Sequence, residues 1–150
     1  MPHFCFFVFL LILAALFAQV EIQIEGAHGW AEKLPTWRME NSVTRWLLGG
    51  KPLTGYHFYV LLFVFLLLHF PVLGGFVECS WAMEGRILSF QILFWVLEDF
   101  FWFVLNPAYG LKRFNRHEVW WHSRHWLWFM PAEYWLATPL AIGLYVWSFR

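Results

Sequence analysis

Three histidines and a glutamate lie close together in the segment 115–125, in a pattern that suits a metal ion. Asn115 followed three residues later by Glu118 has the spacing of a capping box, which predicts that a helix begins at the next residue. On that helix Glu118, His122 and His125 share one face at i, i+4 and i+7. A carboxylate and two imidazoles can bind Zn(II), Fe(II) or Mn(II). The alternative is that Glu118 only caps the helix and that the histidines lie among lipid headgroups.

Two adjacent carboxylates, Glu98 and Asp99, lie inside an apolar stretch. A carboxylate at membrane depth costs about 2.5–3.5 kcal/mol or more, so it usually has a partner and a function. As functional residues they are candidate metal ligands or proton carriers, and we take them as the candidate catalytic pair. The structural alternative is a set of ion pairs with the arginines that follow in the chain, which are Arg113, Arg116 and Arg124.

A further ligand pair is Glu25 and His28, whose E-x-x-H spacing occurs in di-metal carboxylate bundles. Gly26 and Gly29 interrupt this segment and favour a turn instead. Glu21 and Glu25 fall on the same side whether residues 21–25 form a strand or continue a helix.

Composition points to a membrane protein. Of the 150 residues, 61% are hydrophobic and only 13% are charged, whereas soluble domains carry about 25% charged residues. The twelve tryptophans suit long stretches at the lipid–water interface. Nucleic-acid binding is not supported, because the formal net charge is zero and no basic run is present.

Four apolar runs are expected to span the membrane, at residues 4–20, 56–77, 87–105 and 131–147. A cleaved signal peptide is the alternative for the first run, but no Lys or Arg precedes it and Leu16 would occupy the −3 position before a cleavage after Ala18. The predicted fold is therefore all-α, with four transmembrane helices in a single domain. The connections 21–55 and 111–130 are expected to be amphipathic, Trp-rich segments on the cytoplasmic surface.

Orientation follows from the uneven distribution of the basic residues. All Lys and Arg residues except Arg86 and Arg150 lie in the two long connections. They are Lys33, Arg38, Arg45, Lys51, Lys112, Arg113, Arg116 and Arg124. The positive-inside rule places both connections in the cytoplasm and both chain termini outside. Cys5 and Cys79 then fall at the outer ends of the first two spans, where either a disulfide or two free thiols are compatible with the sequence.

The clustering of histidines on one side of a four-span bundle is similar in architecture to membrane di-iron desaturases and hydroxylases. Those enzymes carry HxxxH and HxxHH boxes, whereas His117, His122 and His125 give HxxxxH and HxxH here. The motifs of serine hydrolases, P-loop proteins, dinucleotide-binding folds and HExxH metalloproteases are absent from the sequence.

Together these patterns predict a His/carboxylate site for one or two iron, zinc or manganese ions near the cytoplasmic membrane boundary. The predicted ligands are Glu25, His28, Glu98, Glu118, His122 and His125, with Asp99 as a further ligand or as the partner that orients a histidine. We expect a metalloenzyme, an oxidoreductase or a hydrolase, that acts on a lipid-phase substrate such as an acyl chain, a quinone or an isoprenoid. The competing interpretation is a non-catalytic subunit of a larger membrane complex or a homo-oligomer. The short, loop-poor chain favours a bacterial inner membrane.

Overall fold

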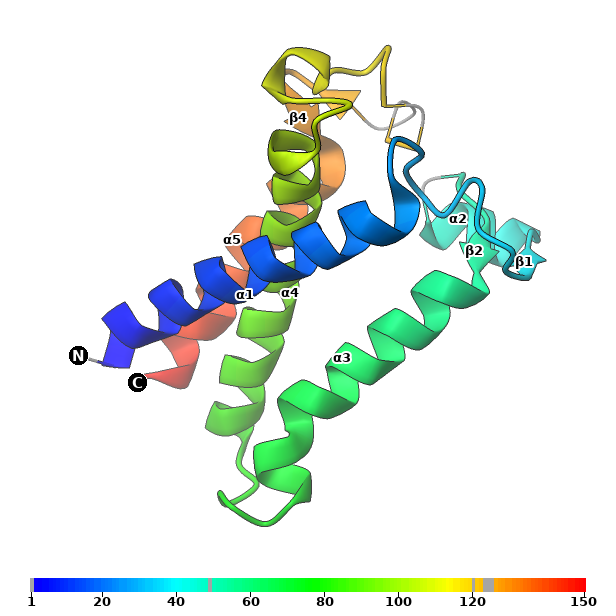
Figure 1. Cartoon of the computed structure of the whole chain (residues 1–150). Helices are drawn as coiled ribbons and strands as arrows, with labels where there is room; N and C mark the ends of the chain where they lie inside the picture. Colours follow the sequence, from blue (N-terminus) through cyan, green and yellow to red (C-terminus); the bar gives the residue numbers. More distant parts are fainter. Residues whose placement is uncertain (1, 49, 120, 123–125) are drawn as a thin grey trace.

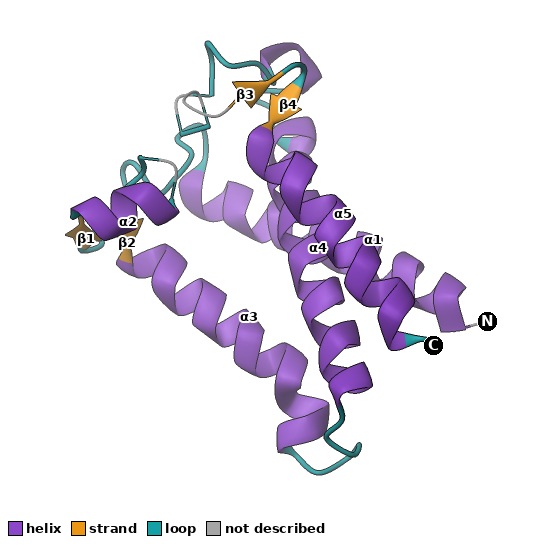
Figure 2. Cartoon of the chain, turned by 180° about the vertical axis from the view of Figure 1, so that it is seen from behind, coloured by secondary structure: helices purple, strands orange, loops and turns teal. Residues whose placement is uncertain are grey.

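The computed structural model describes residues 2–48, 50–119, 121–122 and 126–150, and these are mostly helical. Four long helices account for most of the chain, and the connections between them contain a short helix, a 3₁₀ turn and four very short strands (Figures 1 and 2). In chain order the elements are α1 (Pro2–Glu25), β1 (Arg38–Met39), α2 (Ser42–Leu47), β2 (Leu53–Thr54), α3 (Gly55–Leu73), α4 (Trp81–Leu105), η1 (Leu111–Arg113), β3 (Trp126–Leu127), β4 (Met130–Pro131) and α5 (Ala132–Ser148).

In the described part of the chain, three helices are long and apolar enough to cross a membrane: α1, α3 and α4. The first of them runs on to Glu25, so residues 21–25 continue the helix and do not form a strand. The helix α4 begins at Trp81, earlier than the predicted 87, because the Ser80 side chain accepts a hydrogen bond from the Met83 amide and caps it. The fourth predicted span corresponds to α5, which has 17 residues.

The centre of the bundle is α4, which packs against both α1 and α5, with α1 crossing it at an angle (Figures 1 and 2). Close approach to α5 is possible because Gly85 lies directly against the Trp147 ring. At the same interface, Ser89 Oγ donates a hydrogen bond of 2.8 Å to the Ala141 carbonyl. One buried cluster joins all four long helices: Leu10, Ala14, Val64, Phe90, Leu93, Phe94 and Ala141.

In contrast, α3 diverges from the other long helices and contacts α4 only lightly (Figure 1). Near the α3–α4 turn, His69 joins the two helices: its Nε2 lies 3.1 Å from Glu84 Oε1. Its Nδ1 lies 2.6 Å from the Phe65 carbonyl. Along the rest of its length α3 leaves apolar side chains exposed, as expected for a helix that faces lipid.

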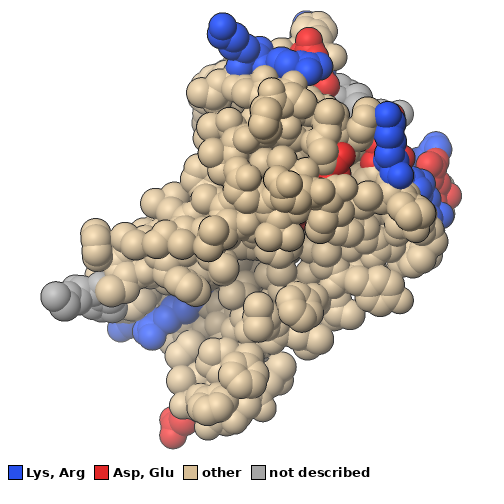
Figure 3. Space-filling view, viewed as in Figure 1, with Lys and Arg blue, Asp and Glu red and all other residues tan. Residues whose placement is uncertain are grey.

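The two long connections lie at one end of the bundle, and both chain termini lie at another (Figure 1). In each connection a short antiparallel ladder closes the loop, with Arg38 opposite Thr54 and Trp126 opposite Pro131. Most of the visible charge gathers over the connections, and the surface of the long helices is largely uncharged (Figure 3). This arrangement fits the charge asymmetry that was read from the sequence.

The prediction of a helix from residue 116 onwards was wrong. The described residues between η1 and α5 form turns and the β3–β4 ladder. The cap itself is present, since Asn115 Oδ1 accepts hydrogen bonds from the His117 and Glu118 amides. The chain then turns inward, because Val119 and Trp121 are buried in a cluster with Phe103, and this burial outweighs a helix nucleus that is costly to form.

Candidate functional site

A cavity of about 170 Å³ lies where α1, α3 and α4 meet, at the end of the bundle that carries the two connections. Four carboxylic side chains line it, two from α1 and two from α4. Aromatic residues and the loop after α1 complete the wall. The lining residues are Glu21, Glu25, Gly29, Trp30, His57, Val60, Leu61, Trp95, Glu98, Asp99, Trp102 and Trp121.

The α1 carboxylates are one helical turn apart and therefore share a face. Both are buried. Glu21 Oε1 accepts a hydrogen bond of 3.0 Å from the Tyr56 hydroxyl of α3. Glu25 Oε1 accepts one of 2.5 Å from the Ala31 amide, which folds the loop after α1 back over the cavity. These two bonds hold both carboxylates in the wall of the cavity.

Glu98 is the most deeply buried of the four carboxylates, with 4% of its surface exposed. Its carboxyl group lies near that of Glu21 in the cavity wall. Glu98 Oε1 has no hydrogen-bond partner among the described residues. Two carboxyls this close repel each other when both are charged, so a proton or a cation must compensate them. A buried acceptor left unpaired within an acidic cavity is the sharpest chemical feature of the site.

Asp99 joins α4 to the second connection and to α5. Asp99 Oδ2 lies 3.0 Å from His122 Nε2 and also accepts a hydrogen bond from the Tyr134 hydroxyl. The other ring nitrogen, His122 Nδ1, lies 4.0 Å from Glu133 Oε2. When His122 donates from Nε2 to Asp99, its Nδ1 keeps a lone pair that can bind a metal or accept a proton.

His57 is a cavity residue that the sequence analysis left out. Thr54 caps α3 by accepting a hydrogen bond from the His57 amide, and the same Oγ1 lies 2.7 Å from His57 Nδ1. The imidazole stacks on the Trp30 ring with centroids 4.0 Å apart. Because Thr54 occupies Nδ1, Nε2 is the nitrogen available to a ligand. The threonine three residues before this histidine is a capping signal that the sequence does contain.

The loop after α1 has an unusual backbone. Trp30 and Ala31 both lie in the left-handed region, with φ of 58° and 51°, a conformation that costs energy for residues other than glycine. Trp30 is held there because its Nε1 donates to the Pro52 carbonyl and Lys51 Nζ lies 4.1 Å from its ring centroid. Burial lowers the pKa of Lys51 from its usual value, and the nearby Asp99 and Glu133 partly oppose this shift.

The structure brings together only part of the predicted ligand set. Glu25, Glu98 and Asp99 line the same cavity, and His122 joins them through Asp99. His28 instead lies on the surface, with Nδ1 3.6 Å from Glu32 Oε2.

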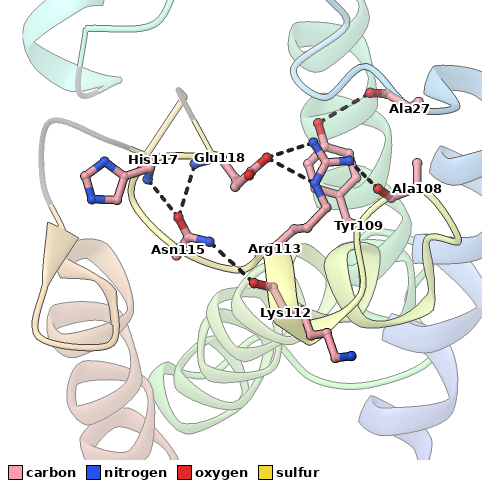
Figure 4. Close-up of polar contacts among 8 residues, drawn as sticks. All are labelled: Ala27, Ala108, Tyr109, Lys112, Arg113, Asn115, His117 and Glu118. Carbon is pink, nitrogen blue, oxygen red and sulfur yellow. Dashed lines mark hydrogen bonds and ion pairs between the residues drawn. The ribbon is translucent and has the colours of Figure 1, made fainter.

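The remaining predicted residues lie in the second connection. Glu118 forms an exposed ion pair with Arg113, at 2.7 Å, beside Asn115 and His117 (Figure 4). Because Arg113 pairs with Glu118, it does not form the ion pair with Glu98 or Asp99 that was the structural alternative for those carboxylates. His125 and Arg124 lie outside the described residues.

Within the described ranges, no three His, Cys, Asp or Glu side chains converge closely enough to hold a metal ion as they stand. The four carboxylates line the cavity without forming such a group. Such an arrangement can hold a proton network, or a cation that draws the carboxylates inward by rotation of their side chains.

Fold and site together define a helical protein in which three helices are able to cross a membrane and an acidic cavity lies at one end of the bundle. Comparison with protein-family models, curated proteins and solved structures finds no match to this chain. Its function must therefore be inferred from the chemistry of the cavity.

Proposed function

We propose that this protein is a membrane metal-binding protein, and a metalloenzyme, whose divalent cation sits in the acidic cavity between α1, α3 and α4. The observation that carries the proposal is Glu98, whose Oε1 is buried and unpaired among the described residues in a cavity that three further carboxylates line. Divalent metal ions are the common ligands that compensate several carboxylates at one point.

The proposed ligands differ from those read off the sequence. Glu21, Glu25 and Glu98 supply oxygen atoms, and His57 supplies Nε2 with Thr54 fixing its ring. Asp99 and Tyr134 orient His122 at the edge of the site, in the manner of the outer hydrogen-bond partners that tune metal sites. Mixed oxygen and nitrogen ligands suit iron, zinc or manganese, and the number of carboxylates allows one ion or two.

Electrostatics favours a cation over an empty cavity. Lys51 lies near Asp99 and Glu133, and burial lowers its pKa, which makes its charged form less favourable there. A bound metal would offset their mutual repulsion in a low-dielectric setting, where such repulsion is strong. To bind one ion together, the carboxylates must change rotamer, and Glu21 and Glu25 must exchange their hydrogen bonds to Tyr56 and Ala31 for the metal.

The location of the cavity bears on the reaction. Val60, Leu61 and Trp95 give the cavity an apolar part of its wall, and we propose that a lipid-phase substrate reaches the metal along it. A metal at this place would activate water or oxygen, or polarise a substrate oxygen. In this proposal α5 is a fourth span, and both long connections face the cytoplasm of a bacterial inner membrane.

The experiment is elemental analysis of the detergent-purified protein after expression with iron, zinc and manganese supplied. We expect near-stoichiometric metal in the wild-type protein and loss of most of it in Glu98→Gln, which keeps the size of the side chain and removes its charge. Glu78→Gln is the matched control, because Glu78 is an exposed carboxylate in the α3–α4 turn. Circular dichroism checks that each variant keeps its helices.

A second pair of variants separates the cavity site from the site read off the sequence. Glu118→Gln should leave the metal content unchanged, since Glu118 is paired with Arg113 on the surface, whereas His57→Ala should lower it. Loss of metal in Glu118→Gln with retention in His57→Ala would contradict the ligand set proposed above. Absence of metal from the wild-type protein would favour the non-catalytic subunit.

A further inference from the structure

A second concave surface lies near the end of α4 opposite the acidic cavity. It is an apolar groove of about 700 Å³, with walls from α1 and α3 and a floor from α4. Phe9 and Leu13 contribute from α1, Leu68 from α3, and Ile87 and Phe90 from α4. Arg86 and Glu98 are twelve residues apart, so the groove's basic residue lies about 18 Å along the helix from the carboxylate of the cavity.

Arg86 is the charged residue of this otherwise apolar lining. Its Nε and Nη2 donate hydrogen bonds of 3.2 and 2.9 Å to the Ser148 carbonyl, and its guanidinium lies 4.2 Å from the Phe149 ring. No ion pair to Arg86 occurs among the described residues. Its positive charge is therefore fixed in position but not neutralised by the described part of the protein.

An uncompensated guanidinium beside a long apolar groove has a specific complement. Hydrocarbon fits the lining, and an anionic group at one end fits Arg86, which binds phosphate well because its donors are arranged in a planar fork. The volume lies in the range of ordinary ligand pockets. In a bilayer, the molecule with both features is a phospholipid of net negative charge.

We propose that the α1–α3–α4 groove is a binding site for an anionic phospholipid, with its phosphate at Arg86 and an acyl chain along Phe9, Leu68 and Phe90. The lipid fills the space between the N-terminal half of α1 and the C-terminal half of α3, and so completes the packing of this half of the bundle. The proposal does not depend on a metal in the acidic cavity, because the two sites share no lining residue.

The chain contains its own probe for this site. Cys5 lines the groove and is exposed, whereas Cys79 is exposed in the α3–α4 turn and lies outside the groove lining. In the detergent-purified Cys79→Ser protein, the maleimide reaction of Cys5 is followed with phosphatidylglycerol or with phosphatidylcholine of the same acyl chains. In the Cys5→Ser protein, Cys79 reports any general effect of the lipid on labelling.

We expect phosphatidylglycerol to slow the labelling of Cys5 at least about fivefold more than phosphatidylcholine does, the factor that one basic residue contributes near a lipid surface. Labelling of Cys79 should be the same in both lipids. Arg86→Gln should abolish the headgroup preference, and Arg86→Lys, which keeps the charge, should retain most of it. Arg150→Gln is the control, because it removes the other basic residue predicted on the same side of the membrane as Arg86, and it should leave the headgroup preference unchanged.

Equal protection of Cys5 by the two lipids, with Arg86 unchanged, would overturn the proposal, because the groove would then not select a lipid of net negative charge. This comparison needs no change at Arg86, so it holds even if Arg86→Gln does not fold. Protection by inorganic phosphate without lipid would also overturn it, since the site would then bind an anion without an acyl chain.

Discussion

At the scale of single residues, the buried Lys51 beside the acidic cavity should make the stability of the protein depend on pH. Burial lowers the pKa of Lys51 from its usual 10.5, so below that value the folded state binds fewer protons than the unfolded state. Stability must then rise with pH as the usual value is approached from below. Unfolding in detergent between about pH 7 and pH 10 should show the wild-type protein gaining stability relative to Lys51→Met as the pH increases.

Lys51→Arg is the matched control for this effect. An arginine stays charged throughout that range, so Lys51→Arg should not gain stability relative to Lys51→Met as the pH increases. A wild-type protein that loses stability relative to Lys51→Met as the pH rises would show that Lys51 is better stabilised as a cation than its burial indicates.

The residue scale also shows how far the sequence could lead to the cavity. Glu98 and Asp99 were identifiable because carboxylates are rare within apolar spans, and Glu25 because it shares a helical face with Glu21. His57 was missed, since its position depends on the Thr54 cap and on Trp30, which approaches it from a different loop. His28 and Glu118 have ligand spacing along the chain, but each forms a local surface pair.

At the scale of elements, the loop after α1 depends on one glycine. A Cβ added at Gly29 would lie 2.4 Å from the Trp121 ring, which is itself packed between Phe103 and Trp102. Gly29→Ala should therefore destabilise the protein by about 1–3 kcal/mol, the usual cost of overpacking. Chemical unfolding in detergent measures this change.

Gly143→Ala makes the same chemical change where no atom lies within 4 Å of the added Cβ. Because Gly143 is inside α5, that variant should be stabilised by roughly 0.5–1 kcal/mol. If the two variants behaved alike, the close contact between the α1 loop and the second connection would be refuted.

Elements whose signals are local were predicted well, and those set by tertiary contacts were not. The apolar runs predicted the long helices, with ends displaced by caps such as that of Ser80 on α4. The helix expected after Asn115 did not form. Its cap is present, but Val119 and Trp121 are buried against α4, and neither the direction of the chain nor the β3–β4 ladder can be read from spacing alone.

At the scale of the whole molecule, the remaining prediction is topology. The His3 ring hydrogen-bonds the Tyr145 hydroxyl, which ties the start of α1 to the end of α5, so we expect both termini on the same side of a membrane. If α1, α3 and α4 cross it, α5 must cross it as well to bring the C-terminus back. Because α5 has only 17 residues, crossing requires local thinning of the bilayer or snorkelling of the residues that flank α5.

Labelling of intact cells with a membrane-impermeant maleimide tests this topology. Native Cys79 should react in the Cys5→Ser background. Arg150→Cys should react as readily as Cys79 when the native cysteines are replaced by serine. Lys33→Cys and Lys112→Cys should react only after the cells are opened, because the positive-inside rule holds both connections in the cytoplasm. Protection of Arg150→Cys beside a reactive Cys79 would mean that α5 does not cross and that the pairing of α1 with α5 is broken in the membrane.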